Sequence, residues 1–140
     1  WGIGTVVLGQ YRILDHLGGG TFGEVYRAED TSGPDGMVAL KQASASLVSL
    51  SPEDKEYVER ARHEARMLKA TSSPHVLRYI KDGVHDDYLV IVMELAGPTL
   101  GKLLETTPKG TPPVDEARAR SIIIQALMGL SAAYRAGLPR

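Results

Sequence analysis

A cluster of glycines near the start of the chain limits the possible folds more than any other segment. The run from Gly18 to Gly23 fits the pattern G-x-G-x-x-G and lies between two stretches that favour β-strands, residues 11–17 and 24–28. Glycine lets backbone amides approach phosphate oxygens closely. A dinucleotide-binding turn would need a helix directly after the glycines. Because a strand follows instead, we expect a hairpin that folds over a nucleotide as a flap. A glycine-rich hairpin without a ligand is the alternative.

The next informative segment is a short apolar strand, residues 37–42, which ends in a lysine. Its core is Val38-Ala39-Leu40-Lys41. A lysine at the edge of a strand can simply extend its amine to solvent. In the functional interpretation, Lys41 neutralises phosphate charge beneath the glycine flap.

Glu64 is singled out by the periodicity of the first predicted helix. Ser51 and Pro52 provide a cap and a first helical residue, and the helix should end near Ala70. At 100° per residue, Glu64 falls inside the apolar stripe, which consists of Tyr57, Val58, Ala61, Ala65 and Leu68. A carboxylate on a buried face needs a partner, and Lys41 is the natural candidate. The alternative is that Glu64 lies at the margin of the stripe and reaches water.

The order of predicted elements gives the fold class. Strands are expected at 11–17, 24–28, 37–42, 76–81 and 88–93, with a turn at 85–87, and helices at 51–70, 100–105 and 114–134, with a loop at 108–113. We therefore predict an α+β protein in which one five-stranded antiparallel sheet is backed by a helix.

Together these segments resemble the protein kinase family over about residues 9–138. The segments that carry the resemblance are the glycine loop 17–25, the strand 38–41, Glu64 with Leu68, Pro74-His75-Val76-Leu77, and the strand 90–95 that enters the hinge. The resemblance implies a kinase N-lobe at residues 1–94, with its sheet and helix C. Residues 95–140 would be the hinge and the start of a C-lobe, with helices D and E, truncated before the catalytic loop.

The resemblance also implies an ATP site. Its residues would be Leu17, Gly18, Gly19, Gly20, Thr21, Phe22, Gly23, Val25, Ala39, Lys41, Met93, Glu94, Leu95 and Ala96. Leu17, Val25 and Ala39 would pack on adenine, Met93 would be the gatekeeper, and the backbone of residues 94–96 would bind the adenine edge. Lys41, positioned by Glu64, would hold the α- and β-phosphates as the catalytic pair of this chain. The Mg²⁺ ligands are expected beyond residue 140.

The implied activity is transfer of the ATP γ-phosphate to serine or threonine of a protein substrate. No catalytic aspartate can be assigned before Arg140, so the chain alone should be inactive. Tyr134 stands where many kinases have histidine, and Pro139 is unusual at its position. A pseudokinase or scaffold, which binds nucleotide or a partner without turnover, is therefore the alternative function.

Composition excludes several other classes. With 16 basic and 17 acidic residues, the chain has no cationic excess for nucleic acid or an anionic membrane. It has no cysteine, which fits a reducing compartment such as the cytoplasm, or the nucleus, and its four dispersed histidines suggest no metal site.

The last predicted helix, residues 114–134, is apolar around most of its circumference. Residues 95–140 cannot cover such a helix, so we expect a partner for it, either the remainder of the C-lobe or another protein.

Overall fold

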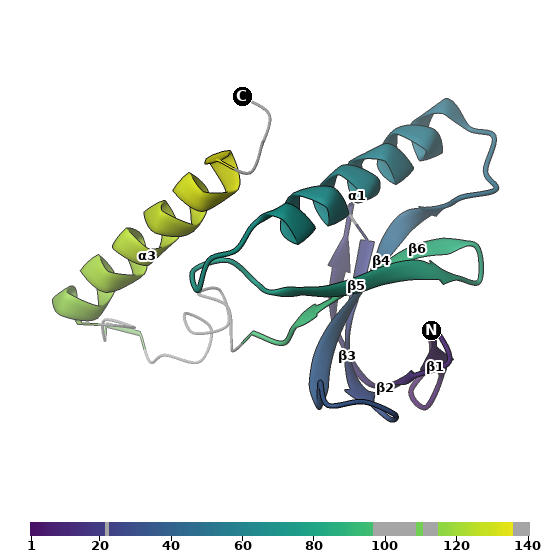
Figure 1. Ribbon diagram of the computed structural model, residues 1–140, viewed down its shortest axis with the longest axis horizontal. Helices are drawn as coiled ribbons and strands as arrows, with labels where there is room; N and C mark the ends of the chain where they lie inside the picture. Colours follow the sequence, from purple (N-terminus) through teal and green to yellow (C-terminus); the bar gives the residue numbers. More distant parts are fainter. Residues whose placement is uncertain (22, 97–108, 111–114, 136–140) are drawn as a thin grey trace.

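The structure, a computed structural model, describes residues 1–21, 23–96, 109–110 and 115–135. The elements are β1 (Val6–Val7), β2 (Tyr11–Gly20), β3 (Gly23–Asp30), β4 (Met37–Ser46), α1 (Pro52–Ala70), β5 (Tyr79–His85), β6 (Tyr88–Glu94) and α3 (Glu116–Arg135). Figure 1 shows a curled sheet with α1 along one face and α3 set to one side. The predicted α+β class is confirmed. The predicted helix at 100–105 lies outside the described residues.

All neighbouring strands of the sheet are antiparallel, in the order β1-β2-β3-β4-β6-β5. The sheet has six strands rather than the predicted five, because Val6 and Val7 pair with Arg12 and Tyr11 at its edge. A two-residue strand has no periodic signal in the sequence. Its pairing depends on the turn that follows it, where Gln10 N donates to Val7 O at 3.1 Å.

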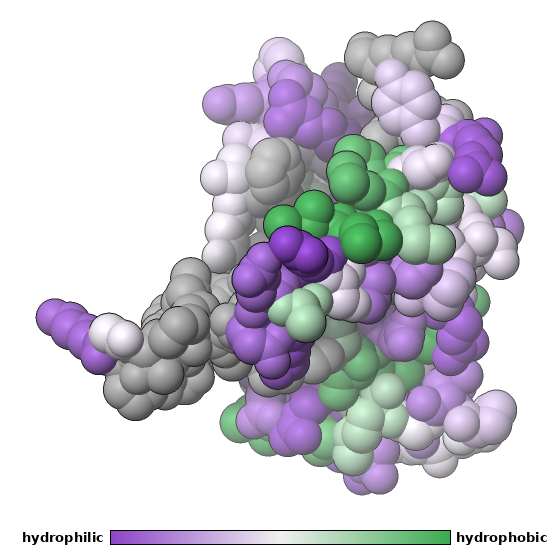
Figure 2. Space-filling model, turned by 90° about the vertical axis from the view of Figure 1, so that its left-hand side faces the viewer, coloured by the Kyte–Doolittle hydropathy of each residue, from purple (hydrophilic) through white to green (hydrophobic). Residues whose placement is uncertain are grey.

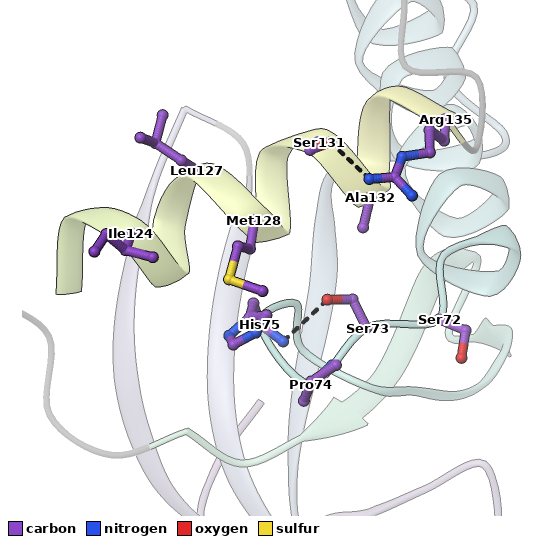
Figure 3. Close-up of a pocket in the computed structure, with 10 residues that line it drawn as sticks. All are labelled: Ser72, Ser73, Pro74, His75, Ile124, Leu127, Met128, Ser131, Ala132 and Arg135. Carbon is purple, nitrogen blue, oxygen red and sulfur yellow. Dashed lines mark hydrogen bonds between the residues drawn. The ribbon is translucent and has the colours of Figure 1, made fainter. Parts of the chain in front are cut away.

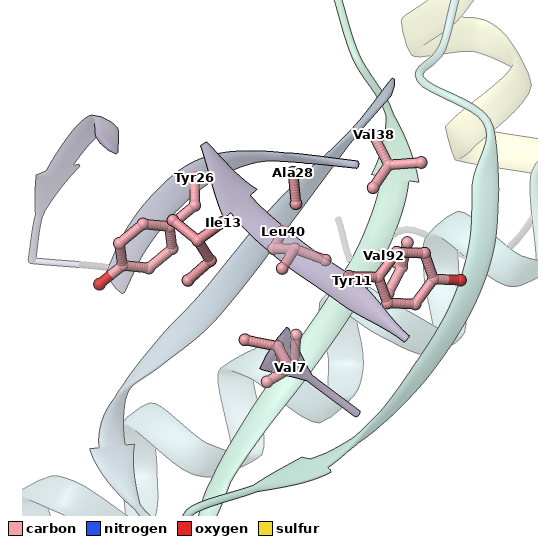
Figure 4. Packing of buried hydrophobic residues seen from close by; sticks show 9 residues of the cluster. Val7, Tyr11, Ile13, Tyr26, Ala28, Val38, Leu40 and Val92 are labelled. Atoms are coloured by element: carbon pink, nitrogen blue, oxygen red, sulfur yellow. The ribbon is translucent and has the colours of Figure 1, made fainter. Parts of the chain in front are cut away.

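The two faces of the sheet have separate cores, as strand alternation requires. On the face away from α1, the cluster consists of Val7, Tyr11, Ile13, Tyr26, Ala28, Val38, Leu40, Val90 and Val92 (Figure 4). On the other face, Ala39, Ile91 and Met93 pack with Ala65 and Leu68 of α1. Lys41 follows Ala39 by two residues, so it shares the face that meets α1.

Helix α1 begins and ends as its sequence predicts. Ser51 is the N-cap, and its side chain accepts a hydrogen bond from Asp54 N at 3.5 Å. At the other end, Thr71 N and Oγ1 both donate to Met67 O, at 3.0 and 2.7 Å. Val58, Ala65 and Leu68 of the predicted stripe are buried. These caps fix where the helix begins and ends, and so the position at which Glu64 faces the sheet.

The strand predicted from residue 76 begins at Tyr79 instead. Before it, Ser73 Oγ accepts a hydrogen bond from His75 N at 3.1 Å, and Ser73 O accepts one from Val76 N at 3.3 Å. These bonds hold the chain in a turn, so pairing with β6 starts later. The β5–β6 hairpin closes at Asp86 and Asp87, whose φ angles of 50° and 66° suit a tight two-residue turn.

Helix α3 contacts the rest of the fold through a close approach at Gly129. A Cβ at that position would lie 2.6 Å from His75 O, so only glycine allows this spacing. Most large apolar side chains of α3 remain exposed: Ile123, Ile124, Leu127, Met128 and Leu130 are 51–61% exposed. Figure 2 views this side of the molecule and shows hydrophobic side chains gathered on its surface. None of the helices among the described residues is long and apolar enough to cross a lipid bilayer.

Candidate nucleotide-binding site

A cleft of about 410 Å³ lies beneath the β2–β3 hairpin. The residues that line it are Leu17, Gly18, Val25, Ala39, Lys41, Glu64, Leu77, Met93, Glu94, Leu95 and Ala96. Its volume is in the usual range for small-molecule sites, and its walls are mostly apolar with a few charged groups. Ten of the residues predicted for the site are therefore brought together around one cavity.

The charged end of the cleft is formed by Lys41 of β4 and Glu64 of α1. Lys41 Nζ donates to both Glu64 oxygens at 2.8 Å. The two side chains are 21% and 33% exposed, so each is partly withdrawn from water but still open to the cleft. The bidentate contact is the one predicted from the helical stripe.

The solvent contact of this pair limits what it adds to folding. An ion pair with such access contributes on the order of 1 kcal/mol to stability, because solvent screens its attraction. Its more consequential effect is geometric. Glu64 fixes the ammonium of Lys41 at the cleft, where an incoming anion finds a positive charge already oriented.

The apolar part of the cleft is formed by residues of β3, β4 and β6 and by the segment before β5. Val25 pairs with Lys41 across β3 and β4, and Ala39 pairs with Met93 across β4 and β6. These pairings place short and branched apolar side chains on one surface, which suits a flat aromatic ring. Leu77, which sequence reasoning did not assign to the site, is 39% exposed and completes the lining. The sequence held no signal for it, because Val76-Leu77 reads as the start of an apolar strand.

The segment that leaves β6 is held in place by Arg78, the residue before β5. Glu94 N donates to Arg78 O at 2.9 Å, and the Glu94 carboxylate accepts from Arg78 N at 3.0 Å. Because these bonds fix Glu94 on the β5 side, the next residues, Leu95 and Ala96, continue along the cleft wall.

The tip of the hairpin holds the remaining predicted residues. Gly19, Gly20, Thr21 and Gly23 belong to the tip and do not line the cleft, and Phe22 lies outside the described residues. A Cβ at Gly20 would meet nothing within 4 Å, so space is open beside the backbone there. Gly23 differs, because its φ is +125° and a Cβ would lie 2.0 Å from Gln42 O. Glycine is thus required at 23 by the fold itself.

A second cleft, of about 500 Å³, lies between α3 and the loop after α1 (Figure 3). Ile124, Leu127 and Met128 form its α3 side, and His75 lies on the loop side. Arg135, the cation of this cleft, already donates to Ser131 Oγ at 3.1 Å. None of the residues predicted to bind ATP lines it. The combination of an apolar wall and an oriented cation favours the hairpin cleft as the nucleotide site.

The glycine hairpin over a strand lysine, with a helix carboxylate behind it, defines a kinase-like fold. A sequence profile of the protein kinase domain matches residues 11–138, which is most of the chain. The chain therefore belongs to the protein kinase family.

Relatives and solved structures agree with this assignment. Serine/threonine-protein kinase 1 of Arabidopsis thaliana is 34% identical over 123 residues, 87% of this chain and 14% of the relative. Serine/threonine-protein kinase pkn2 of Myxococcus xanthus is 34% identical over 134 residues, 95% of this chain and 15% of the relative. The PknI kinase domain of M. tuberculosis superposes with a TM-score of 0.72 at 24% identity, over 99% of this chain and 52% of that one. The likeness to PknI shows the fold. This chain spans about a seventh of the two curated relatives and about half of the PknI chain.

Proposed function

We propose that this chain is the ATP-binding portion of a protein kinase that transfers the γ-phosphate of ATP to serine or threonine of protein substrates. The observation that carries the proposal is the bidentate contact between Lys41 and Glu64 at the charged end of the cleft, 2.8 Å from Nζ to each oxygen. The names of the two curated relatives support the serine/threonine preference.

Each part of the cleft suits one part of ATP. Leu17, Val25 and Ala39 would cover adenine, with Met93 behind it, and the backbone of residues 94–96 would bind its polar edge. Lys41 would hold the α- and β-phosphates, and the amides of the glycine hairpin would lie over them. Phosphoryl transfer depends on positioning and charge neutralisation more than on covalent chemistry by the protein. The groups present in this chain supply binding and orientation.

The family implies Mg²⁺ as well as ATP. Within the described part of the chain, no three His, Cys, Asp or Glu side chains are grouped closely enough to hold a metal ion. We propose residues 1–94 as the N-lobe and residues 95–140 as the hinge and the start of the C-lobe, with the metal ligands beyond them.

The test is the replacement Lys41→Met in the full-length protein. Loss of the ammonium should lower phosphoryl transfer about a hundredfold or more, because an oriented charge at the phosphates is removed. The thermal unfolding midpoint should change little, since the ion pair contributes little to stability. Transfer is measured with radiolabelled ATP and a serine/threonine peptide library. Lys55→Met, on the exposed side of α1, is the matched control and should keep the wild-type rate.

Two outcomes would change the assignment. If Lys41→Met transferred phosphate at the wild-type rate, Lys41 would have no role at the phosphates. If the wild-type protein bound ATP with an affinity that depended on Lys41 but transferred nothing, the function would be that of a pseudokinase or scaffold.

A further inference from the structure

A second contact between a basic and an acidic side chain lies on the flap itself, away from Lys41. His16 of β2 pairs with Tyr26 of β3, and its side chain reaches diagonally to Glu24, with His16 Nε2 2.5 Å from Glu24 Oε2. Both side chains are about half exposed, at 53% and 45%. Glu24 follows directly after the last glycine of the cluster, so the contact joins the tip of the hairpin to a residue four positions before Gly20.

The space for this contact is provided by Gly19. A Cβ at Gly19 would lie 2.0 Å from Glu24 Oε2, whereas a Cβ at Gly18 or Gly20 would meet nothing within 4 Å. Alternate residues of a strand point to opposite faces, so Gly19 and its two neighbours present different surfaces. Gly18 lines the nucleotide cleft. The Glu24 carboxylate therefore lies across the face of the glycine strand opposite to the cleft.

This arrangement suggests how the flap keeps its shape. Residues 18–20 have no side chains, so they contribute no packing that would hold β2 against β3 near the tip. The Glu24 side chain covers Gly19, and His16 anchors its far end. We propose that His16 and Glu24 are a positioning pair whose protonation-dependent contact holds the glycine hairpin over the phosphates of ATP. The proposal rests on the function proposed above.

Among the polar groups near His16, Glu24 is the acidic group that contacts it. From β3, the Tyr26 ring lies edge-on, with its centroid 5.3 Å from that of His16. Burial, and then the Glu24 carboxylate, raise the pKa of the Tyr26 phenol, so Tyr26 stays neutral. Its hydroxyl donates to Gln42 of β4 at 3.2 Å and accepts from the amino group of Trp1 at 2.8 Å.

The neighbouring charges on the same two strands are already engaged with each other. Arg27 Nε donates to Asp15 Oδ2 at 2.7 Å. Farther from the tip, Arg12 lies 3.8 Å from Glu29.

The expected pH dependence follows from the charge of the imidazole. Histidine is the side chain whose charge commonly changes within the physiological range of pH. The protonated ring makes a charge-assisted hydrogen bond to the carboxylate, which is stronger than the bond from a neutral ring. ATP should therefore bind more tightly at about pH 6 than at about pH 8, by about two- to fivefold, the size expected for an exposed pair.

The experiment compares ATP dissociation constants of the full-length protein at about pH 6 and about pH 8. His16→Gln should remove the pH-dependent gain and keep the weaker affinity at both pH values. His16→Arg, which is charged throughout, should keep the tighter affinity at both. Glu24→Gln should behave as His16→Gln does. Glu29→Gln removes the same charge from the same strand away from the tip, and it should keep the wild-type profile. Ionisation of ATP itself is common to all variants and cancels in the comparison.

Adenosine, which lacks phosphates, serves as the second ligand and should bind equally to the wild type and His16→Gln at both pH values. If the wild type, His16→Gln and His16→Arg shared one pH profile for ATP, the positioning role would be overturned while the nucleotide site stood. A difference that was equally large with adenosine would also overturn it. Failure of the wild type to bind ATP at either pH would instead refute the function on which the proposal rests.

Discussion

Asp30, at the end of β3, is a nearly buried carboxylate that is only 8% exposed. Gln10 Nε2 donates to its Oδ1 at 2.8 Å, and the amides of Ser32 and Asp35 donate to its two oxygens at 3.2 Å each. These bonds organise the loop between β3 and β4. They satisfy a charge that would otherwise be costly to bury. The strand that carries Lys41 begins directly after this loop, so Asp30 organises the turn that leads into β4.

The first residue-scale prediction concerns the effect of acid on this network. The hydrogen bond from Gln10, followed by those from the backbone amides, lowers the pKa of Asp30 below its ordinary value of 3.8. A carboxyl group with a lowered folded-state pKa stabilises the fold above its unfolded pKa, and this contribution is lost as pH falls through the folded value. The wild type should therefore lose stability below about pH 4.

Asp30→Asn should be less stable than the wild type at neutral pH, because a neutral amide accepts these bonds less strongly. The difference should shrink as pH falls below about 4. Urea unfolding at a series of pH values measures both effects. Glu59→Gln, at a 70% exposed side chain of α1, is the control. A gap between wild type and Asp30→Asn that stayed constant to the lowest pH would contradict the assigned role.

At the residue scale, some of the site could be predicted because one residue broke a pattern. Glu64 was identified because it falls in an apolar helical stripe, and its contact with Lys41 is confirmed. The contact between His16 and Glu24 has no such signal, because both are polar residues on a strand surface. Asp30 was missed for the same reason. Its burial follows from the loop that folds back over it.

At the element scale, glycine serves two different purposes in the glycine hairpin. Gly23 has a φ of +125°, and a Cβ there would lie 2.0 Å from the backbone oxygen of Gln42. Gly20, the residue paired with it across the hairpin, has open space at the Cβ position. Gly23 is required by the backbone conformation, whereas Gly20 leaves room for a ligand.

This difference predicts that the same substitution destabilises the fold at one position and has little effect at the other. Gly23→Ala should lower the free energy of unfolding by about 1–3 kcal/mol, because the backbone conformation is strained for any other residue and β4 must move. Gly20→Ala should leave the free energy of unfolding close to that of the wild type. Denaturant unfolding of the two variants provides the comparison. Equal stability of Gly20→Ala and Gly23→Ala would contradict the distinction.

The limits of helix α1 were predictable because Ser51, Pro52 and the apolar stripe are local signals that agree with one another. Strand ends depended on partners distant in sequence. β1 exists because Val6 and Val7 reach the edge of β2, and β5 begins late because of the turn at residues 73–76. Such pairings depend on tertiary contacts, and the sequence of a short strand does not reveal them.

At the scale of the whole molecule, the two ends of the chain differ in how they bury apolar surface. The sheet and α1 enclose cores on both faces of the sheet. Helix α3 buries only Gly129 and Ala133. Exposed apolar surface of this extent on one helix is typical of an interface. In a protein kinase of which this chain is about half, as in the PknI comparison, the remainder of the C-lobe is the proposed cover.

The last prediction follows from this uncovered helix. The 140-residue chain expressed alone should self-associate through α3, because association removes apolar side chains from water. Replacing Ile123 and Leu127, which are 60% and 61% exposed, by glutamine should reduce the association measured by sedimentation equilibrium. Replacing Val48 and Leu50, which are 67% and 84% exposed in the segment before α1, is the matched control and should not reduce it. If both pairs of substitutions reduced association equally, general surface hydrophobicity would explain it. A specific effect of the α3 pair would show that the apolar face of α3 is the surface through which the chain associates.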